Sequence, residues 1–207
     1  MKKHLLILIA VNLVAFGLWA GPLKIVNVNF PQINCLFSTN CTVTTVDSSA
    51  PITFNGATGS GRMLTRMFNV ATNSPMAGRY SYAYRIDLST IMSPTTNDYI
   101  DSLRINFGPI VPFTYNGIPS NMVWVATVGG VGNVAPSSAL QLGNEVTFRF
   151  NPPIFTASPV AKGQSTFTIG MISIHPPTNF TATITGFQGS GQPIPLNPNV
   201  LVRSPRY

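Results

Sequence analysis

The stretch Arg79-Tyr-Ser-Tyr-Ala-Tyr-Arg-Ile-Asp-Leu88 alternates strictly between two kinds of side chain. Successive side chains of a β-strand point to opposite faces of the sheet. One face would carry Tyr80, Tyr82, Tyr84, Ile86 and Leu88, and the other would carry Ser81, Ala83, Arg85 and Asp87. The stretch therefore predicts a strand with one aromatic and apolar face, because its period is two rather than the 3.6 of a helix.

Further short apolar stretches, most of them bounded by turn signals, lie on both sides of it. The expected strands are Ile25–Phe30, Thr42–Val46, Pro51–Phe54, Arg62–Phe68, Leu103–Phe107, Ile110–Tyr115, Asn121–Val128, Glu145–Phe150, Thr166–Ile174 and Phe180–Phe187. Asn-Gly pairs at 55–56 and 116–117 are strong turn signals. Short strands at this spacing are typical of an all-β fold, and we expect a single-domain antiparallel β-sandwich, jelly-roll or immunoglobulin-like. Asn121–Val128 is apolar on both faces, so it should be a doubly covered strand.

The composition excludes several classes of protein. Only 8% of the 207 residues are charged, against about 25% in an average soluble domain. Disordered chains combine high charge with low hydrophobicity, and coiled coils are rich in Glu, Lys, Leu and Ala. A polytopic membrane protein needs several long apolar runs, whereas this chain has one. A β-rich domain punctuated by glycine and proline remains.

Residues 1–20 have the layout of a secretory signal peptide. Lys2 and Lys3 precede the apolar run Leu5–Ala15, and small residues follow it. Such a leader is removed at a small-residue site, here after Gly17 or after Ala20. The alternative is an uncleaved anchor, but the apolar stretch is shorter than the roughly 20 residues that a span needs. We expect a secreted, periplasmic or cell-surface protein with no membrane span after cleavage.

Three regions are expected after the signal peptide. Residues 21–50 form an extended N-terminal segment with a disulfide loop, residues 51–188 the sandwich domain, and residues 189–207 an irregular, Pro-rich tail. The disulfide would join Cys35 and Cys41, because cysteine pairs of exported proteins meet an oxidising compartment. A metal site at this pair would need further ligands, and histidine is nearly absent from the chain.

The basic side chains are scattered along the sequence. Removal of Lys2 and Lys3 leaves ten of the twelve Lys and Arg residues against five Asp and Glu residues. Nucleic-acid-binding proteins gather such residues on one face, so we expect no nucleic acid partner. Arg62 and Arg66 share a strand face, where they would be solvated charges that deter edge-to-edge aggregation. The alternative is an anion-binding stripe.

Groups that could perform acid–base chemistry are few. After cleavage they are Asp47, Asp87, Asp98, Asp101, Glu145 and His175. Asp98 and Asp101 are the only local carboxylate pair, and a glycosidase needs two carboxyl groups facing each other across a cleft. His175 stands alone at a strand end, whereas a hydrolytic triad needs its base beside a nucleophile. We therefore expect a protein that is not an enzyme, with a hydrolase using these three residues as the weakest alternative.

Metal and cofactor sites are equally poorly supported. Asn97, Asp98 and Asp101 offer fewer oxygens than the six to eight that calcium takes, and Asn97 and Asp98 suit a turn or helix cap. The glycine-rich runs at 56–61 and 129–132 lack the lysine and the following helix of a phosphate loop. We expect no metal and no cofactor.

Two rows of side chains offer binding surfaces. Tyr80, Tyr82 and Tyr84 could form a platform for sugar rings, because tyrosine has an apolar face and a polar tip. Their neighbours Ile86 and Leu88 favour a core face instead, and a partner interface is a third reading. The threonines at 181, 183 and 185 could order water, although threonine is also common on the solvent face of ordinary strands.

Four segments of the chain bear a family resemblance. They are Gly59–Phe68, Tyr82–Leu88, Ile105–Pro109 and Val125–Gly132. In this order they resemble a group of exported bacterial proteins without assigned function, over residues 55–185. The resemblance implies a secreted bacterial β-domain and supplies no catalytic residues.

The leading hypothesis is an exported, non-enzymatic β-sandwich with a binding or structural role at the cell envelope or outside the cell. Its partner would be envelope polysaccharide or a second copy of the chain. The second hypothesis is a subunit of a surface fibre or coat. There the extended ends Pro22–Phe30 and Gly189–Tyr207 would add a strand to the edge of a neighbour. The third is a carbohydrate-binding module or a hydrolase.

Overall fold

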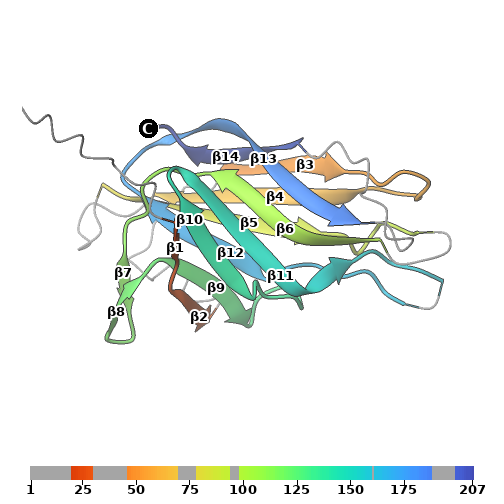
Figure 1. Cartoon of the computed structure of the whole chain (residues 1–207), viewed down its shortest axis with the longest axis horizontal. Helices are drawn as coiled ribbons and strands as arrows, with labels where there is room; N and C mark the ends of the chain where they lie inside the picture. The colour runs from red at the N-terminus through yellow and green to blue at the C-terminus, as the bar shows by residue number, and fades with distance from the viewer. Residues whose placement is uncertain (1–19, 30–45, 70–77, 94–97, 160, 188–198) are drawn as a thin grey trace, which may run out of the picture.

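The fold is all-β. The computed structural model of the chain describes residues 20–29, 46–69, 78–93, 98–159, 161–187 and 199–207, which form strands, turns and loops without a helix. Accordingly, these ranges hold no apolar helix of membrane-spanning length. Two large sheets are stacked face to face (Figure 1), so the predicted two-sheet architecture is confirmed.

Sheet A contains six antiparallel strands. Their order is β1 (Ala20–Pro22), β10 (Ser138–Leu142), β11 (Glu145–Phe155), β6 (Tyr99–Asn106), β13 (Pro177–Phe187) and β14 (Asn199–Pro205). Sheet B also contains six strands. Their order is β2 (Ile25–Asn29), β9 (Val123–Val128), β12 (Thr168–Ser173), β5 (Tyr80–Asp87), β4 (Gly61–Asn69) and β3 (Val46–Ile52). Only β2 and β9 are parallel among these pairs.

A small hairpin of β7 (Phe113–Tyr115) and β8 (Ile118–Asn121) stands apart from both sheets (Figure 1). Its turn is formed by the Asn-Gly pair that the sequence singled out. Asn116 and Gly117 have φ angles of 47° and 75°, and the tight turn that suits the twist of a hairpin needs positive φ at both positions.

The end of the chain differs from the irregular tail that we expected. Residues 199–205 form β14, which pairs with β13 from Asn199 opposite Thr183 to Pro205 opposite Pro177. Val200 and Val202 face the core while Leu201 is exposed, which is the alternation of a half-buried strand. The prolines at 193, 195 and 198 precede this pattern in the sequence and obscured it.

The start of the described chain is extended, as expected, and contributes to both sheets. β1 pairs with β10 in sheet A, and β2 then runs parallel to β9 in sheet B. Leu23 and Lys24 carry the chain between them, and the Leu23 N–H still donates to the Ala139 carbonyl (2.9 Å). The extended segments Ala20–Asn29 and Asn199–Pro205 therefore pair with strands of their own chain.

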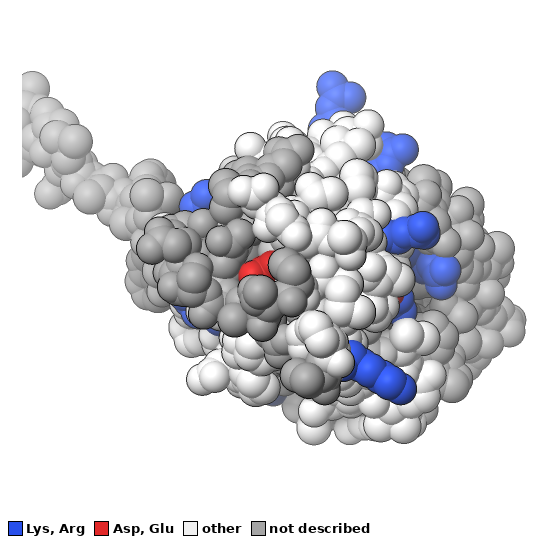
Figure 2. All heavy atoms as spheres, turned by 90° about the vertical axis from the view of Figure 1, so that its right-hand side faces the viewer, with Lys and Arg blue, Asp and Glu red and all other residues white. Residues whose placement is uncertain are grey.

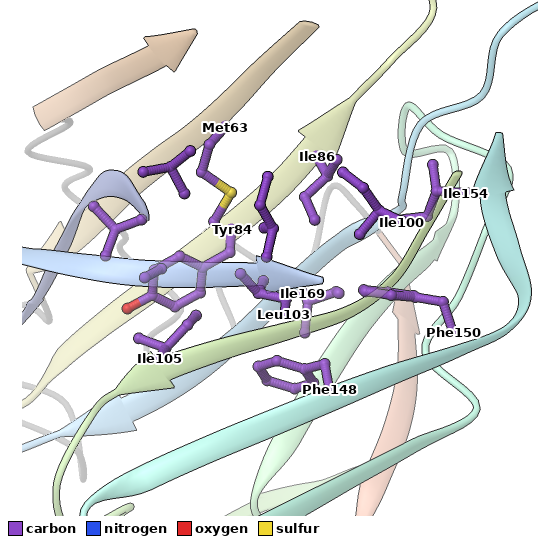
Figure 3. Packing of buried hydrophobic residues seen from close by; sticks show 14 of the residues in the cluster. Met63, Tyr84, Ile86, Ile100, Leu103, Ile105, Phe148, Phe150, Ile154 and Ile169 are labelled. Carbon is purple, nitrogen blue, oxygen red and sulfur yellow. The ribbon is translucent and has the colours of Figure 1, made fainter. Parts of the chain in front are cut away.

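The main core lies between the two sheets. The apolar face of β5 contributes Tyr82, Tyr84 and Ile86, and Leu88 follows directly after the strand; none of the four is more than 1% exposed. Figure 3 shows the Tyr84 ring between Met63 of β4 and Ile105 of β6, so one side chain contacts both sheets. Burying a side chain of this size stabilises the fold by about 1.5–3 kcal/mol.

A second apolar cluster covers part of the outer face of sheet B. Trp124, Phe68, Ala83 and Ile172 are buried there, and Phe113 of the β7–β8 hairpin packs with them. All four residues from 123 to 126 are fully buried, so the prediction of a doubly covered strand is confirmed. The other face of β5 is therefore also partly covered, which its Ser81 and Ala83 did not suggest.

Candidate functional site

The tyrosine row of β5 is core. Tyr82 and Tyr84 have no exposed surface, and Tyr80 is half-buried against the same cluster. A ring without exposed surface cannot stack on a sugar, so Tyr82 and Tyr84 cannot serve in the ligand platform that we considered. The core interpretation of the row is the one that the burial supports.

Two hydroxyl groups of this row bond to carbonyls outside sheet B. The Tyr82 hydroxyl donates to the His175 carbonyl (2.8 Å), and the Tyr84 hydroxyl donates to the Arg203 carbonyl of β14 (2.9 Å). Burial raises the pKa of both phenols above the ordinary value, because the phenolate would lose its hydration. Both rings are therefore held neutral, as hydrogen-bond donors, over the physiological range of pH.

Asp98 has a structural partner set. It is 5% exposed, and its Oδ2 accepts from the Ser93 hydroxyl (2.7 Å). The Thr156 hydroxyl contacts the Ser93 hydroxyl (2.9 Å), and the Asp98 N–H donates to that same Thr156 oxygen (3.2 Å). This closed network fastens the connection before β6 to the end of β11, so Asp98 is anchored inside the fold rather than facing a cleft.

His175, Asp87 and Glu145 have partners of their own. The His175 ring meets the ring of Tyr207 edge-on, with centroids 6.4 Å apart. The Asp87 Oδ2 pairs with Arg85 (2.7 Å), and Glu145 pairs with Arg104 (3.6 Å). No group of three or more His, Cys, Asp or Glu side chains that could hold a metal ion occurs within the described ranges.

The Asp87 carboxyl is held in its charged form by its neighbours. Burial alone would raise its pKa, but hydrogen bonds from the Ser89 hydroxyl and N–H, together with the Arg85 guanidinium, outweigh burial. The pKa of Asp87 therefore lies below its ordinary value, and the carboxylate is held charged at the end of β5. This is the signature of a turn-stabilising acid rather than of a general acid, which needs a raised pKa.

Several predicted features fall outside the described residues. They are the signal peptide up to residue 19, the cysteines of the predicted disulfide (Cys35 and Cys41) and Asn97.

Arg62 and Arg66 are exposed on the outer face of β4. Figure 2 shows most of the Lys and Arg side chains at one end of the molecule standing apart, with uncharged surface between them.

A different aromatic row lies on the outer face of sheet A. Tyr99 of β6 pairs with Phe155 of β11 on one side and with Phe187 of β13 on the other. The ring centroids of Phe155 and Phe187 lie 5.6 Å and 5.8 Å from that of Tyr99. All three rings are half-buried, and none belongs to the main core. They form an aromatic row, defined here as Phe155, Tyr99 and Phe187, that crosses three strands.

The aromatic row lies beside a break in the sheet. The register shifts between Arg149 and Ile154 on one side of β6, and between Thr185 and Gly186 on the other. Asp101 is the residue of β6 that neither ladder pairs, and its Oδ1 is buried without a hydrogen-bond partner. Bulges of this kind re-aim side chains and are frequent at functional sites.

Beyond the break the same face carries short polar and basic side chains. Ser102 stands between Arg149 and Thr185, and Arg104 stands between Thr147 and Thr183. Arg149 and Thr185 are exposed. The threonines of β13 thus lie on the solvent side of the sheet, as their alternation predicted.

None of the aromatic row was singled out from the sequence. Phe187 has the same parity as Thr181, Thr183 and Thr185, so it could have been placed on the solvent face. Tyr99 and Phe155 gave no such signal, because both lie outside the strands that the pattern predicted. No protein-family model matches the chain, and no curated protein is significantly similar to it. The function is therefore inferred from the residues of this face.

Proposed function

We propose that the protein is exported and acts by binding, rather than by catalysis, at the cell envelope or outside the cell. The observation that carries this proposal is the aromatic row on the outer face of sheet A. Half-buried rings outside the core leave part of their apolar surface in contact with water, which is unfavourable. Aromatic side chains are enriched in recognition surfaces, where an apolar ring can also carry a polar tip. By contrast, Asp87 supports a turn, Asp98 anchors a loop and Glu145 pairs with Arg104 on the neighbouring strand.

The leader sequence supports export. Lys2, Lys3 and the apolar run Leu5–Ala15 follow the signal-peptide pattern, and the resemblance to exported bacterial proteins agrees with it. Within the sandwich class we infer jelly-roll or immunoglobulin-like connectivity, because the chain crosses repeatedly between the sheets, as at β5–β6, β9–β10 and β12–β13.

The fibre-subunit hypothesis has less support. Its donor strands would be the two extended ends, but β1, β2 and β14 each pair within this chain. Donation of one of them to a neighbour would first require the strand to leave its own sheet. A binding role needs no such rearrangement.

The test has two parts. Bacterial cells expressing the full chain are fractionated, with Leu8→Arg to break the apolar run of the leader and Lys3→Arg as a control that keeps its basic start. We expect a shortened chain outside the cytoplasm for the wild type and the control, and retention of Leu8→Arg. The exported chain should then co-sediment with insoluble envelope polysaccharide without releasing sugar. Cytoplasmic retention of the wild type, absence of co-sedimentation, or release of sugar would each contradict the proposal.

A further inference from the structure

The two outer faces of the sandwich are unlike each other. The outer face of sheet B carries the second apolar cluster, in which Trp124 and Ile172 are fully buried beneath Phe113. Among the described residues, the apolar clusters include no comparable group on the outer face of sheet A. Thr181 and Thr185 of β13, Arg104 of β6 and Arg149 of β11 are all exposed there. A large ligand therefore has direct access to the middle of sheet A.

Side chains that are mostly polar, with two arginines among them, form rows across this face. One row runs through Asn199, Thr183, Arg104, Thr147 and Leu140, on five neighbouring strands. A second row runs through Thr185, Ser102, Arg149 and Ser138. Ser102 is buried within this row, so its accessible side chains are those of Thr185, Arg149 and Ser138. Because neighbouring strands lie about 4.8 Å apart, the first row is about 19 Å long. The face offers hydroxyl groups along a line, which suits an extended ligand.

The rows carry an excess of positive charge. Arg104 and Arg149 are diagonal neighbours on paired strands, so their Cβ atoms lie within about 8 Å of each other. Glu145 is the exposed acid of this face, and it contacts Arg104 at 3.6 Å. Asp101 is half-buried, and no ion pair joins it or any other described carboxylate to Arg149. Arg203 adds a third guanidinium on β14, with a buried Nε that has no hydrogen-bond partner.

The aromatic row and the guanidinium groups lie within reach of one ligand. Tyr99 and Ser102 are three residues apart on β6, which is about 10 Å along a strand. Ser102 is the partner of Arg149. An extended polymer could thus place one ring on the aromatic row and an anionic group at Arg149. Guanidinium groups bind carboxylate, sulfate or phosphate through two parallel hydrogen bonds.

We propose that the outer face of sheet A binds an acidic polysaccharide. The inference rests on the proposed binding function and names its ligand class. The aromatic row contacts the apolar faces of sugar rings, the Ser and Thr rows exchange hydrogen bonds with sugar hydroxyls, and Arg104 and Arg149 pair with the acidic groups. A flat face binds each repeat weakly, so affinity comes from many repeats binding at once. The positive balance of the whole chain after cleavage attracts the same kind of polymer.

The binding test uses polymers matched in backbone and different in charge. Polygalacturonate is compared with its methyl ester, and dextran sulfate with dextran, by affinity electrophoresis of the full chain. We expect each anionic polymer to bind at least about tenfold more tightly than its neutral counterpart. A single-stranded thymidine oligonucleotide should bind more weakly than either anionic polymer. Failure of both anionic polymers to bind, equal binding of the neutral ones, or tighter binding of the oligonucleotide would overturn the proposal.

Matched variants locate the site. Arg104→Gln with Arg149→Gln, and separately Tyr99→Leu with Phe187→Leu, should each weaken polygalacturonate binding about tenfold or more. Arg62→Gln removes one exposed guanidinium from the opposite face, and its binding should change less than about twofold. Circular dichroism and urea titration confirm that each variant is folded before its affinity is compared. Equal binding by the sheet A variants and the wild type would overturn the assignment of this face.

The two proposals can fail separately. Where the sheet A variants still co-sediment with envelope polysaccharide as the wild type does, the binding function stands and the assigned face is wrong. Where the wild type itself binds no envelope material, the binding function is wrong.

Discussion

Tyr84→Phe removes one oxygen from the centre of the sandwich. The Tyr84 side chain has no exposed surface, and its hydroxyl donates to the Arg203 carbonyl at 2.9 Å. A typical hydrogen bond contributes about 0.5–1.5 kcal/mol, and leaving its buried partner unsatisfied costs about 1–3 kcal/mol. Because Arg203 is only half-buried, water can replace part of the lost bond. We expect the free energy of unfolding to fall by about 1–2 kcal/mol.

The chain supplies its own control for this substitution. Tyr80 lies on the same strand and faces the same core, but it is half-buried and its hydroxyl makes no hydrogen bond to a described residue. Urea titration followed by circular dichroism gives the free energy of unfolding of both variants. Tyr80→Phe should lie within about 0.5 kcal/mol of the wild type. Equal stability of Tyr84→Phe and Tyr80→Phe would refute the view that the hydroxyl ties β14 to sheet B.

Three further predictions follow from other contacts. Burial raises the pKa of Tyr82 and Tyr84, so above about pH 10 the unfolded chain releases protons that the folded chain keeps. The free energy of unfolding should therefore fall with rising pH by up to about 1.4 kcal/mol per unit for each phenol, and Tyr82→Phe should flatten the slope in urea titrations at several alkaline pH values. An unchanged slope would contradict the role of burial. Asp98→Ala should lower the free energy of unfolding by about 2–3 kcal/mol, because it opens the buried network with Ser93 and Thr156. Asp101→Ala should lower it less, since the Asp101 Oδ1 has no hydrogen-bond partner. The reverse order of the two variants in urea titration would contradict this assignment. Gly170→Ala places a methyl group against the Trp124 indole, so it should lower the free energy of unfolding by about 1–3 kcal/mol and lower the thermal midpoint. Gly21→Ala has open space at its Cβ and should have little effect on the thermal midpoint.

The alternation of β5 predicted much of the fold. It placed Tyr82, Tyr84, Ile86 and Leu88 on one face, and that face is the main core. It could not say whether the opposite face was covered, because Ser81 and Ala83 are small enough for either environment. The cover is supplied by Phe113 and Trp124, which pack there only through contacts distant in the sequence.

The strands at or next to the edges of sheet A were harder to predict. β1 has three residues and β10 has five, which is too short for a period of two to stand out. β14 is longer, but three prolines precede it. Such segments become strands because a neighbouring strand supplies their hydrogen bonds, and this information is not local.

The aromatic row shows the same limit at the candidate site. Tyr99, Phe155 and Phe187 come from three strands that are far apart in the sequence, and the registers of β6, β11 and β13 bring them together. The tyrosines of β5 were more conspicuous because they are close in sequence. Tyrosines close together along the chain indicated a core face, whereas the half-buried aromatic row is assembled by strand pairing.

Backbone amide chemical shifts, measured while polygalacturonate is added to the isotope-labelled protein, test the central claim most directly. The account predicts that the largest changes fall on the outer face of sheet A, at Tyr99, Arg149 and Thr185. The amides of Ser81 and Trp124, on the covered side of sheet B, should change little. Changes concentrated on sheet B, or no changes at a polymer concentration that saturates binding in electrophoresis, would contradict the account.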